Sequence, residues 1–228
     1  MSDAIALSWS RLSTYRQCPK QFEAKYISKS YPDESSNPAF TKGNKIHSQV
    51  EEYINAKKQD AELPTLGKIA SNAIPIVNRM FDSNPAESIS AELQVAVDHD
   101  WNQVGWFDSA DVIKYRSIMD MLVIGNEKAT ILDWKTGKHR PYADEIGQLH
   151  LSSSIIFEMY PSIQEITNAY LFLEHKKTDK HVFTREDHPK TRAKFDVEYI
   201  EINEDEEFAP KKNSYCHFCL IKSECPYG

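Results

Sequence analysis

The sequence predicts an α+β fold in which helices flank a central mixed β-sheet. Three observations indicate this class. Apolar residues recur with a helical period early in the chain, they alternate with polar residues from Ala91 to Val97, and strands and helices then mix without a regular βαβ order. The chain has 228 residues, seven glycines and no low-complexity linker, so we expect a single domain over residues 1–228.

Composition narrows the class of protein. Apolar residues make up 40% of the chain and charged residues 27%, which is typical of a soluble globular protein. The longest apolar run, Ala169–Leu173, is far shorter than the ~20 residues that cross a bilayer, and no secretory signal is apparent. We therefore expect no membrane partner and a place in the cytoplasm, or in the host cytoplasm for a viral protein. The net charge of −7 argues against nonspecific coating of nucleic acid.

The first helices are predicted from their ends and their period. Ser8 or Ser10 can cap a helix that ends near Cys18, and Pro19 suits the start of the next helix. A longer helix is expected over residues 40–54, with His47 on its apolar side. Another is expected over residues 66–81, with a kink at Pro75.

The middle of the chain predicts strands. After the strand at residues 91–97, two more are expected at residues 118–124 and 130–135, joined by a hairpin loop at residues 125–128. This hairpin register places Asp120 directly opposite Asp133. Lys135, two residues further on, shares their face.

The last third predicts one helix and three strands. The helix follows Pro141 and carries one apolar stripe, formed by Ile146, Leu149, Ser153, Ile156 and Tyr160. The strands are expected near residues 166–174, 181–185 and 195–200.

The cysteines indicate a metal site. Cys18 stands alone near the start, whereas Cys216, Cys219 and Cys225 lie together near the end. Disulfides are not expected without export, so the four are interpreted first as thiols or metal ligands. A lone cysteine joined to a group of three suits an iron–sulfur cubane slightly better than zinc, and four unrelated cysteines are the further alternative.

The opposed carboxylates Asp120 and Asp133 indicate a second metal site. Like charges facing each other on a sheet repel unless a cation lies between them, and one or two carboxylates are the protein ligands that Mg²⁺ usually takes. Lys135 could then orient water or neutralise charge on phosphorus. An ordinary strand with an ion pair is the alternative. His47 taken alone is more often a core residue than a ligand.

Together these motifs resemble the iron–sulfur members of the RecB-like branch of the PD-(D/E)xK nucleases, similar to CRISPR-adaptation nucleases and AddB-type nuclease domains. The resemblance spans nearly the whole chain. The matching stretches are Ser10–Pro19, Gly43–His47, Ser117–Asp120, Asp133–Gly137, Gln148-Leu149 and the closing cysteine group.

The resemblance implies a restriction-endonuclease-like core and two cofactors. Mg²⁺ or Mn²⁺ would be bound by His47, Asp120, Asp133 and the backbone carbonyl of Trp134. Lys135 would be the catalytic lysine, and Gln148 would position it or the phosphate. A 4Fe–4S cluster would join residues 1–30 to residues 205–228 through Cys18, Cys216, Cys219 and Cys225.

Two positions depart from the family pattern. Asp133 stands where glutamate is common. Ser152 stands where a tyrosine is usual, which puts in doubt how the helix that carries Gln148 contacts DNA. Glu92 is a weaker candidate for the rim of the site. Arg11, Tyr15 and Arg16 could guide a single strand by charge and stacking, although such residues are common on surfaces.

The sequence therefore predicts a metal-dependent DNA exonuclease or end-processing nuclease that acts on single strands or DNA ends. Proteins of recombination, replication or CRISPR adaptation are the expected partners. Two alternatives stay open. One is a catalytically reduced DNA-binding subunit of such a complex, and the other is an iron–sulfur redox or sensor protein.

Overall fold

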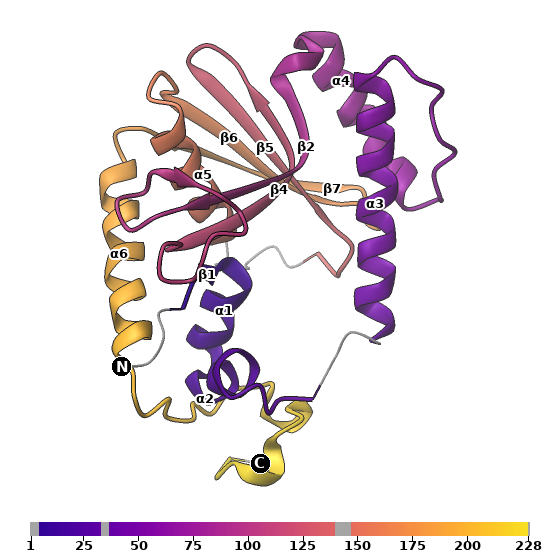
Figure 1. Ribbon diagram of the computed structural model, residues 1–228. Coiled ribbons are helices and arrows are strands. Elements are labelled where there is room, and N and C mark those ends of the chain that lie inside the picture. The colour runs from indigo at the N-terminus through magenta and orange to yellow at the C-terminus, as the bar shows by residue number, and fades with distance from the viewer. Residues whose placement is uncertain (1–4, 33–36, 140–146, 228) are drawn as a thin grey trace.

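The computed structural model describes residues 5–32, 37–139 and 147–227 (Figure 1). Its centre is a mixed sheet. The strands are β1 (Leu7–Ser8), β2 (Ile89–Val97), β3 (Gln103–Val104), β4 (Tyr115–Ile124), β5 (Lys128–Lys135), β6 (Glu165–Phe172) and β7 (Lys177–Thr184). They follow the order β3-β2-β4-β5-β6-β7, and β1 also pairs with β4. The β1–β4 and β5–β6 pairs are parallel and the others antiparallel, which confirms the predicted α+β class with a mixed sheet.

Helices flank this sheet. They are α1 (Trp9–Gln17), α2 (Pro19–Phe22), α3 (Pro38–Lys58), α4 (Ile74–Ser83), α5 (Gly147–Met159) and α6 (His188–Glu204), with short 3₁₀ turns at residues 70–73, 86–88, 216–218 and 222–224. In Figure 1, α5 and α6 lie on one side of the sheet and α3 and α4 on the other. The predicted start at Pro19 is confirmed, and the chain continues from α2 into a π-helix at Glu23–Ile27.

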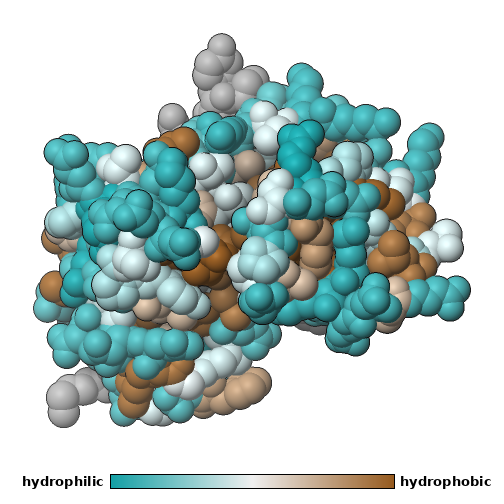
Figure 2. Space-filling view, turned by 90° about the horizontal axis from the view of Figure 1, so that it is seen from above, coloured by the Kyte–Doolittle hydropathy of each residue, from teal (hydrophilic) through white to brown (hydrophobic). Residues whose placement is uncertain are grey.

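Two apolar clusters hold the layers together. The larger one packs one face of the sheet against α1, α5 and α6, with Leu12, Ile155 and Phe195 fully or almost fully buried. The second packs the other face against α3 and α4, through residues such as Val50 and Val77. On the face seen from above in Figure 2, hydrophilic side chains predominate, and hydrophobic ones gather near the middle and toward the right.

The predicted hairpin between β4 and β5 has the expected register. Met121 pairs with Leu132, and the pairs continue to Ile124 with Ala129. The Gly125 backbone N–H donates a 2.8 Å hydrogen bond to the Lys128 carbonyl and closes the turn. The next residues along the two strands are Asp120 and Asp133, so the sequence pattern placed this pair correctly.

The strand predicted at residues 195–200 is wrong, because these residues lie within α6. Phe195, Val197 and Tyr199 alternate with acidic residues, which resembles a strand pattern. The buried apolar residues of this segment are instead Phe195, Tyr199 and Ile202, whose spacing matches one helical face. Val197 and Ile200 stay exposed, which removes the apparent alternation.

Pro75 begins α4 instead of kinking it, because the chain before it forms only a turn and a 3₁₀ segment. A proline in the first helical turn loses no hydrogen bond, since its missing N–H would have no partner there. The expected helix start after Pro141, including Ile146, lies outside the described residues. Within the described ranges, no helix has the length and apolar character needed to cross a bilayer.

Candidate metal centre and cysteine site

Strand β4 changes neighbours along one edge, and this opens a gap in the sheet. β1 pairs with Tyr115 and Arg116, whereas β5 pairs only from Met121 onward, so residues 117–120 face the space between them. Asp120 extends into this space. Its Oδ2 accepts a 2.6 Å hydrogen bond from the backbone N–H of Trp134. The carboxylate of Asp120 is therefore fixed where the two strands separate.

Asp133, Lys135 and Gln148 form one connected group beside this gap. The Gln148 side-chain amide donates to Asp133 Oδ2 at 2.6 Å, and the Lys135 ammonium donates to Gln148 Oε1 at 2.9 Å. The ammonium also lies 2.7 Å from Asp133 Oδ1, although that buried oxygen accepts no hydrogen bond of normal geometry. Burial raises the pKa of Asp133 to about 6 even though Lys135 opposes this shift.

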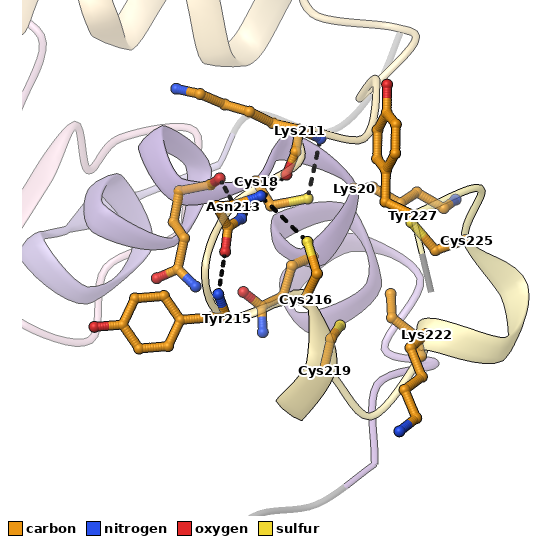
Figure 3. A pocket seen from close by; sticks show the side chains of 13 residues that line it. Cys18, Lys20, Lys211, Asn213, Tyr215, Cys216, Cys219, Lys222, Cys225 and Tyr227 are labelled. Carbon is orange, nitrogen blue, oxygen red and sulfur yellow. Dashed lines mark hydrogen bonds between the residues drawn. The ribbon is translucent and has the colours of Figure 1, made fainter.

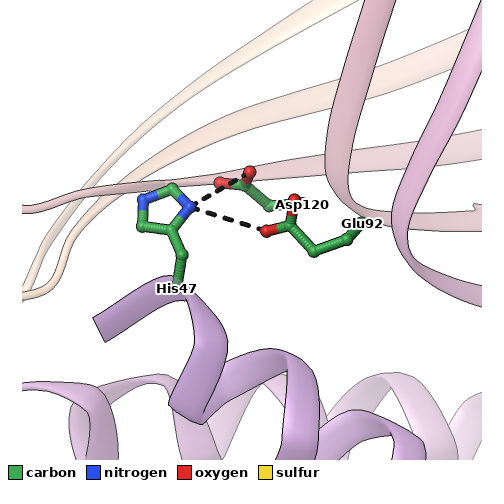
Figure 4. Close-up of side chains that lie close together, drawn as sticks. All are labelled: His47, Glu92 and Asp120. Atoms are coloured by element: carbon green, nitrogen blue, oxygen red, sulfur yellow. Dashed lines mark ion pairs between the residues drawn. The ribbon is translucent and has the colours of Figure 1, made fainter. Parts of the chain in front are cut away.

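A second group of acidic and imidazole side chains lies in the same region (Figure 4). His47 Nδ1 from α3 lies 3.3 Å from Asp120 Oδ1 and 3.6 Å from Glu92 Oε1 of β2. Candidate ligand atoms of the three residues lie within 4.8 Å of one another. Among the described residues, no other three His, Cys, Asp or Glu side chains meet this criterion.

Glu92 reaches this group because the backbone of β2 departs from regular strand geometry at this position. Its φ is 45°, a left-handed value that is unfavourable for a residue with a side chain. Regular alternation would put Ala91 and Leu93 on one face, yet Ala91 packs with the cluster under α3 and Leu93 with the cluster under α5. Met121 and Met119, their partners on β4, divide in the same way. In both strands, the side chains therefore change faces of the sheet at the pair formed by Glu92 and Asp120.

These donors fit a small divalent cation. Carboxylate oxygens with one imidazole are suitable ligands for Mg²⁺ or Mn²⁺. Asp133 lies outside this group of three, and its Oδ1 faces the Lys135 ammonium at 2.7 Å. Burial disfavours the charged form of His47, but the adjacent Asp120 and Glu92 outweigh it and raise the pKa of His47 to about 10. The protein therefore places a positive charge between these carboxylates when no cation is bound.

An open hollow leads to this metal centre along α3. It is lined by Gly43, His47, Glu51, Glu92, Thr136 and their neighbours. Gly43 and His47 are both part of the motif stretch that the sequence singled out. His47 and Glu92 can therefore be reached from solvent.

The four cysteines line a single pocket, although they come from opposite ends of the chain (Figure 3). Backbone N–H groups point at two of the sulfurs. The Asn213 N–H donates to Cys216 Sγ at 3.3 Å, and the Lys211 N–H donates to Cys18 Sγ at 3.5 Å. Such donors stabilise negative charge on sulfur, as metal-bound thiolates require.

The spacing of the sulfurs bears on the kind of metal. Within the described residues, no three cysteine sulfurs lie within 4.8 Å of one another. A mononuclear zinc site with Zn–S bonds of about 2.3 Å would bring its sulfurs closer than that. A cubane, in which each thiolate binds a different iron, needs a wider separation. The cysteine sulfurs therefore line one pocket without meeting the spacing that a single zinc ion requires.

The three basic and aromatic candidates for strand binding have different surroundings. Tyr15 packs edge-on against Phe22, and its hydroxyl donates to Asp205. Arg16 forms an ion pair with Glu198. These two side chains therefore already bind protein groups that join α1 to α6 and to the residue that follows it. Arg11 lies elsewhere, beside β1, where it donates to the Ala6 carbonyl.

From the sequence, Glu92 was expected only at the rim of the site, whereas its carboxylate lies with His47 and Asp120. The pairing of β2 with β4 would have revealed this position, because Glu92 lies opposite Asp120 in the register. The long segment between these strands carries no tight turn signal, so their register could not be read from the sequence. Trp134 is buried, and its backbone N–H holds Asp120.

Comparisons with known proteins agree with this architecture. A model of the PD-(D/E)XK nuclease superfamily matches residues 6–226. The solved structure of the protein SSO0001 is 12% identical with a TM-score of 0.51, over 99% of this chain and 88% of that one. A solved protein from Eubacterium rectale described as a "Putative exonuclease" is 15% identical with a TM-score of 0.53, over 96% of this chain and 87% of that one.

These two likenesses show the fold. Among curated proteins, none matches the chain in sequence. The family model, by contrast, covers almost every residue, including both carboxylates at the strand gap, the lysine beside them and all four cysteines. The chain belongs to the PD-(D/E)XK nuclease superfamily.

Proposed function

We propose that this protein is a metal-dependent deoxyribonuclease that hydrolyses phosphodiester bonds at DNA ends. The observation that carries the proposal is the meeting of Asp133, Lys135 and Gln148 with His47, Glu92 and Asp120 at one gap in the sheet. Phosphodiester hydrolysis needs a cation site and a positive group near the reacting phosphate. The acidic side chains would form the cation site, and Lys135 would be the positive group.

His47, Glu92, Asp120 and Asp133 would hold Mg²⁺ or Mn²⁺, and the backbone carbonyl of Trp134 would complete the protein ligands. A divalent cation bound there supplies electrostatic stabilisation for the charge that develops on the phosphate. Glu92 joins this proposal because its oxygen lies within 3.6 Å of His47 Nδ1. Its left-handed backbone is consistent with a functional position, where strain of this kind is often found.

Lys135 and Gln148 would act on the water and the phosphate. The Lys135 ammonium is held by Asp133 and by Gln148 Oε1, so its position is set before substrate arrives. From there it can orient an attacking water or donate to a phosphate oxygen. Gln148 uses its oxygen for Lys135 and its nitrogen for Asp133, which fixes the distance between the cation ligand and the lysine.

The four cysteines would hold a 4Fe–4S cluster, and the chain would then belong to the iron–sulfur branch of the superfamily. The cluster would join residues 1–30 to residues 205–228 within a single nuclease domain. Its role would be structural, because hydrolysis transfers no electrons. The shared cysteine pocket and the backbone donors to Cys18 and Cys216 support this proposal.

An exonuclease that acts on single strands or ends fits best, and one of the similar solved structures carries the word exonuclease in its description. Partners in DNA recombination, replication or CRISPR adaptation, and a place in the cytoplasm, complete the proposal. The open hollow along α3 gives a strand access to the site without a deep tunnel.

The test uses anaerobically purified protein with linear single-stranded, linear duplex and circular DNA. Each substrate is incubated with Mg²⁺, with Mn²⁺ or with chelator. We expect cleavage of the linear substrates that needs the cation and that Asp133→Ala abolishes. An absence of cleavage under every condition would instead support a DNA-binding subunit, and equal cutting of circles would exclude a strict exonuclease.

A further inference from the structure

A second hollow opens on the other side of the sheet gap, between β1, the start of α1 and the first half of β4. Its walls include Arg11, Trp106, Arg116, Ile118 and Gln148. Gln148 is also the residue that bonds Asp133 and Lys135, so this hollow adjoins the proposed catalytic group. Arg116 lies four residues before Asp120 on the same strand, a separation of about 13 Å along β4.

The hollow is positively charged although the chain carries a net charge of −7. Arg11 and Arg116 are both among its lining residues, and no carboxylate is. Among the residues that the structure describes, neither guanidinium forms an ion pair. Two unneutralised guanidinium groups in one partly buried hollow are suited to binding an anion, and planar guanidinium groups match phosphate well.

Both arginines are held in position without being neutralised. Arg11 donates to the Ala6 carbonyl, and its guanidinium lies over the Tyr26 ring. Arg116 donates to the Asp108 carbonyl at 3.1 Å, and its guanidinium lies 5.5 Å from the centre of the Trp106 ring. Each guanidinium has five N–H donors, so most of them remain for a ligand. Within the described part of the chain, the buried Arg116 Nε–H has no acceptor.

Aromatic side chains lie beside the two arginines. Trp106 forms part of the wall, and the adjacent Phe107 is 92% exposed. Exposed aromatic rings beside basic groups are typical of surfaces that bind single-stranded nucleic acid, because bases and sugars pack on the rings while phosphates meet the charges. Ser8 and Ser10 add hydroxyl donors at the same rim.

We propose that this hollow binds a phosphate of the DNA strand one or more nucleotides away from the scissile bond, through Arg116 and Arg11, with Trp106 and Phe107 packing against the adjoining nucleoside. The inference rests on the proposed nuclease function and assigns the substrate strand its path, from the hollow along α3, past Gln148, to the hollow beside β1. The phosphate is either a strand terminus or an internal phosphodiester, since both present the same anion.

The test measures binding of fluorescent single-stranded oligonucleotides by anisotropy, in chelator so that no cleavage occurs, at several salt concentrations. The oligonucleotides share one sequence and carry a 5′-phosphate, a 3′-phosphate or neither. Arg116→Met removes one charge from the hollow, and Arg79→Met removes the same charge from the exposed face of α4. Arg116→Lys keeps the charge.

We expect Arg116→Met to weaken binding about tenfold, the size of one charge-assisted contact. The slope of log affinity against log salt should fall by about 0.7, the value for one phosphate contact on a single strand. Arg79→Met should leave both quantities unchanged, and Arg116→Lys should retain the slope. A loss confined to one phosphorylated oligonucleotide assigns the terminal phosphate, and an equal loss on all three assigns an internal one.

A second pair of variants leaves the Arg116 guanidinium unchanged. Ile118 is 41% exposed at the wall of the hollow, and Val182 is 51% exposed on β7. Ile118→Glu should weaken binding by repelling phosphate, whereas Val182→Glu should not. The proposal is overturned if the wild-type protein binds no oligonucleotide at low salt, or if Arg116→Met and Ile118→Glu both bind with wild-type affinity and slope. Binding that depends on Arg116, together with no cation-dependent cleavage, would overturn the nuclease function and leave this strand site intact.

Discussion

At the scale of single residues, the site depends on side chains that replace regular sheet contacts. Asp120 accepts from the Trp134 N–H where β4 and β5 separate, and Glu92 adopts a left-handed backbone opposite it. The hairpin register predicted Asp120 and Asp133 as neighbours from the sequence alone. The change of side-chain direction in β2 and β4 could not be predicted. It does not shift the register between the two strands, and it shows only in the apolar cluster against which each side chain packs.

His47 should make the metal-free protein sensitive to alkaline pH. Its pKa is about 10 in the folded protein, against an ordinary value of 6.5, so the folded state binds the proton more tightly than the unfolded state. The resulting stabilisation is complete below pH 6.5 and is lost as the pH rises through about 10. In chelator, the difference in free energy of unfolding between wild type and His47→Gln should therefore shrink between pH 6.5 and pH 10. A constant difference in denaturant unfolding across this window would contradict the pairing of His47 with Asp120 and Glu92.

At the scale of elements, close contact between α1 and α5 positions Gln148. Gly147 begins α5, and a Cβ added there would overlap the ring of Trp9, the first residue of α1. The sequence predicted both helices but not their contact, because nothing in either apolar pattern tells where two helices meet. It also predicted a strand at residues 195–200, since alternation over a few residues resembles a strand until the helix on either side is known.

Gly147→Ala should therefore destabilise the protein by about 1–3 kcal/mol, the usual cost of overpacking a buried contact. Gly137→Ala is the matched control, because a Cβ at Gly137 meets no atom within 4 Å. Denaturant unfolding of both variants checks this. Equal stability of Gly147→Ala and Gly137→Ala would mean that Trp9 does not pack against the start of α5.

At the scale of the whole molecule, α1 and α2 lie beside the C-terminal segment beneath the sheet (Figure 1). Lys211 Nζ donates to the Arg16 carbonyl, and Asn213 donates to the Gln17 carbonyl, in addition to the Tyr15–Asp205 contact. The spacing of the cysteines predicted that these ends meet, although the polar contacts between them gave no sequence signal. Although the net charge is −7, Arg11 and Arg116, which form no ion pair with any other described residue, lie together in the hollow beside β1.

Cys219→Ala should remove the brown chromophore of an iron–sulfur cluster together with much of the stability. A link between Cys18 and the C-terminal cysteines closes most of the chain into a loop, which is worth ~5 kcal/mol against the unfolded state. Ser223→Ala, in the same C-terminal segment, should keep both colour and stability. Visible absorbance and denaturant unfolding of anaerobically purified variants check this, and a colourless wild type containing zinc would contradict it.

The central claim is that Lys135, held by Asp133 and Gln148, acts at a cation site that cuts DNA. The most direct measurement compares cleavage of end-labelled single-stranded DNA by wild type, Lys135→Met and Lys138→Met, with Mn²⁺ and with equal thermal stability verified. Lys138 is an exposed lysine three residues further along the chain. We predict that Lys135→Met loses cleavage about 100-fold or more, as expected when a group that stabilises developing charge is removed, while Lys138→Met retains it. Cleavage by Lys135→Met at the wild-type rate would contradict the account.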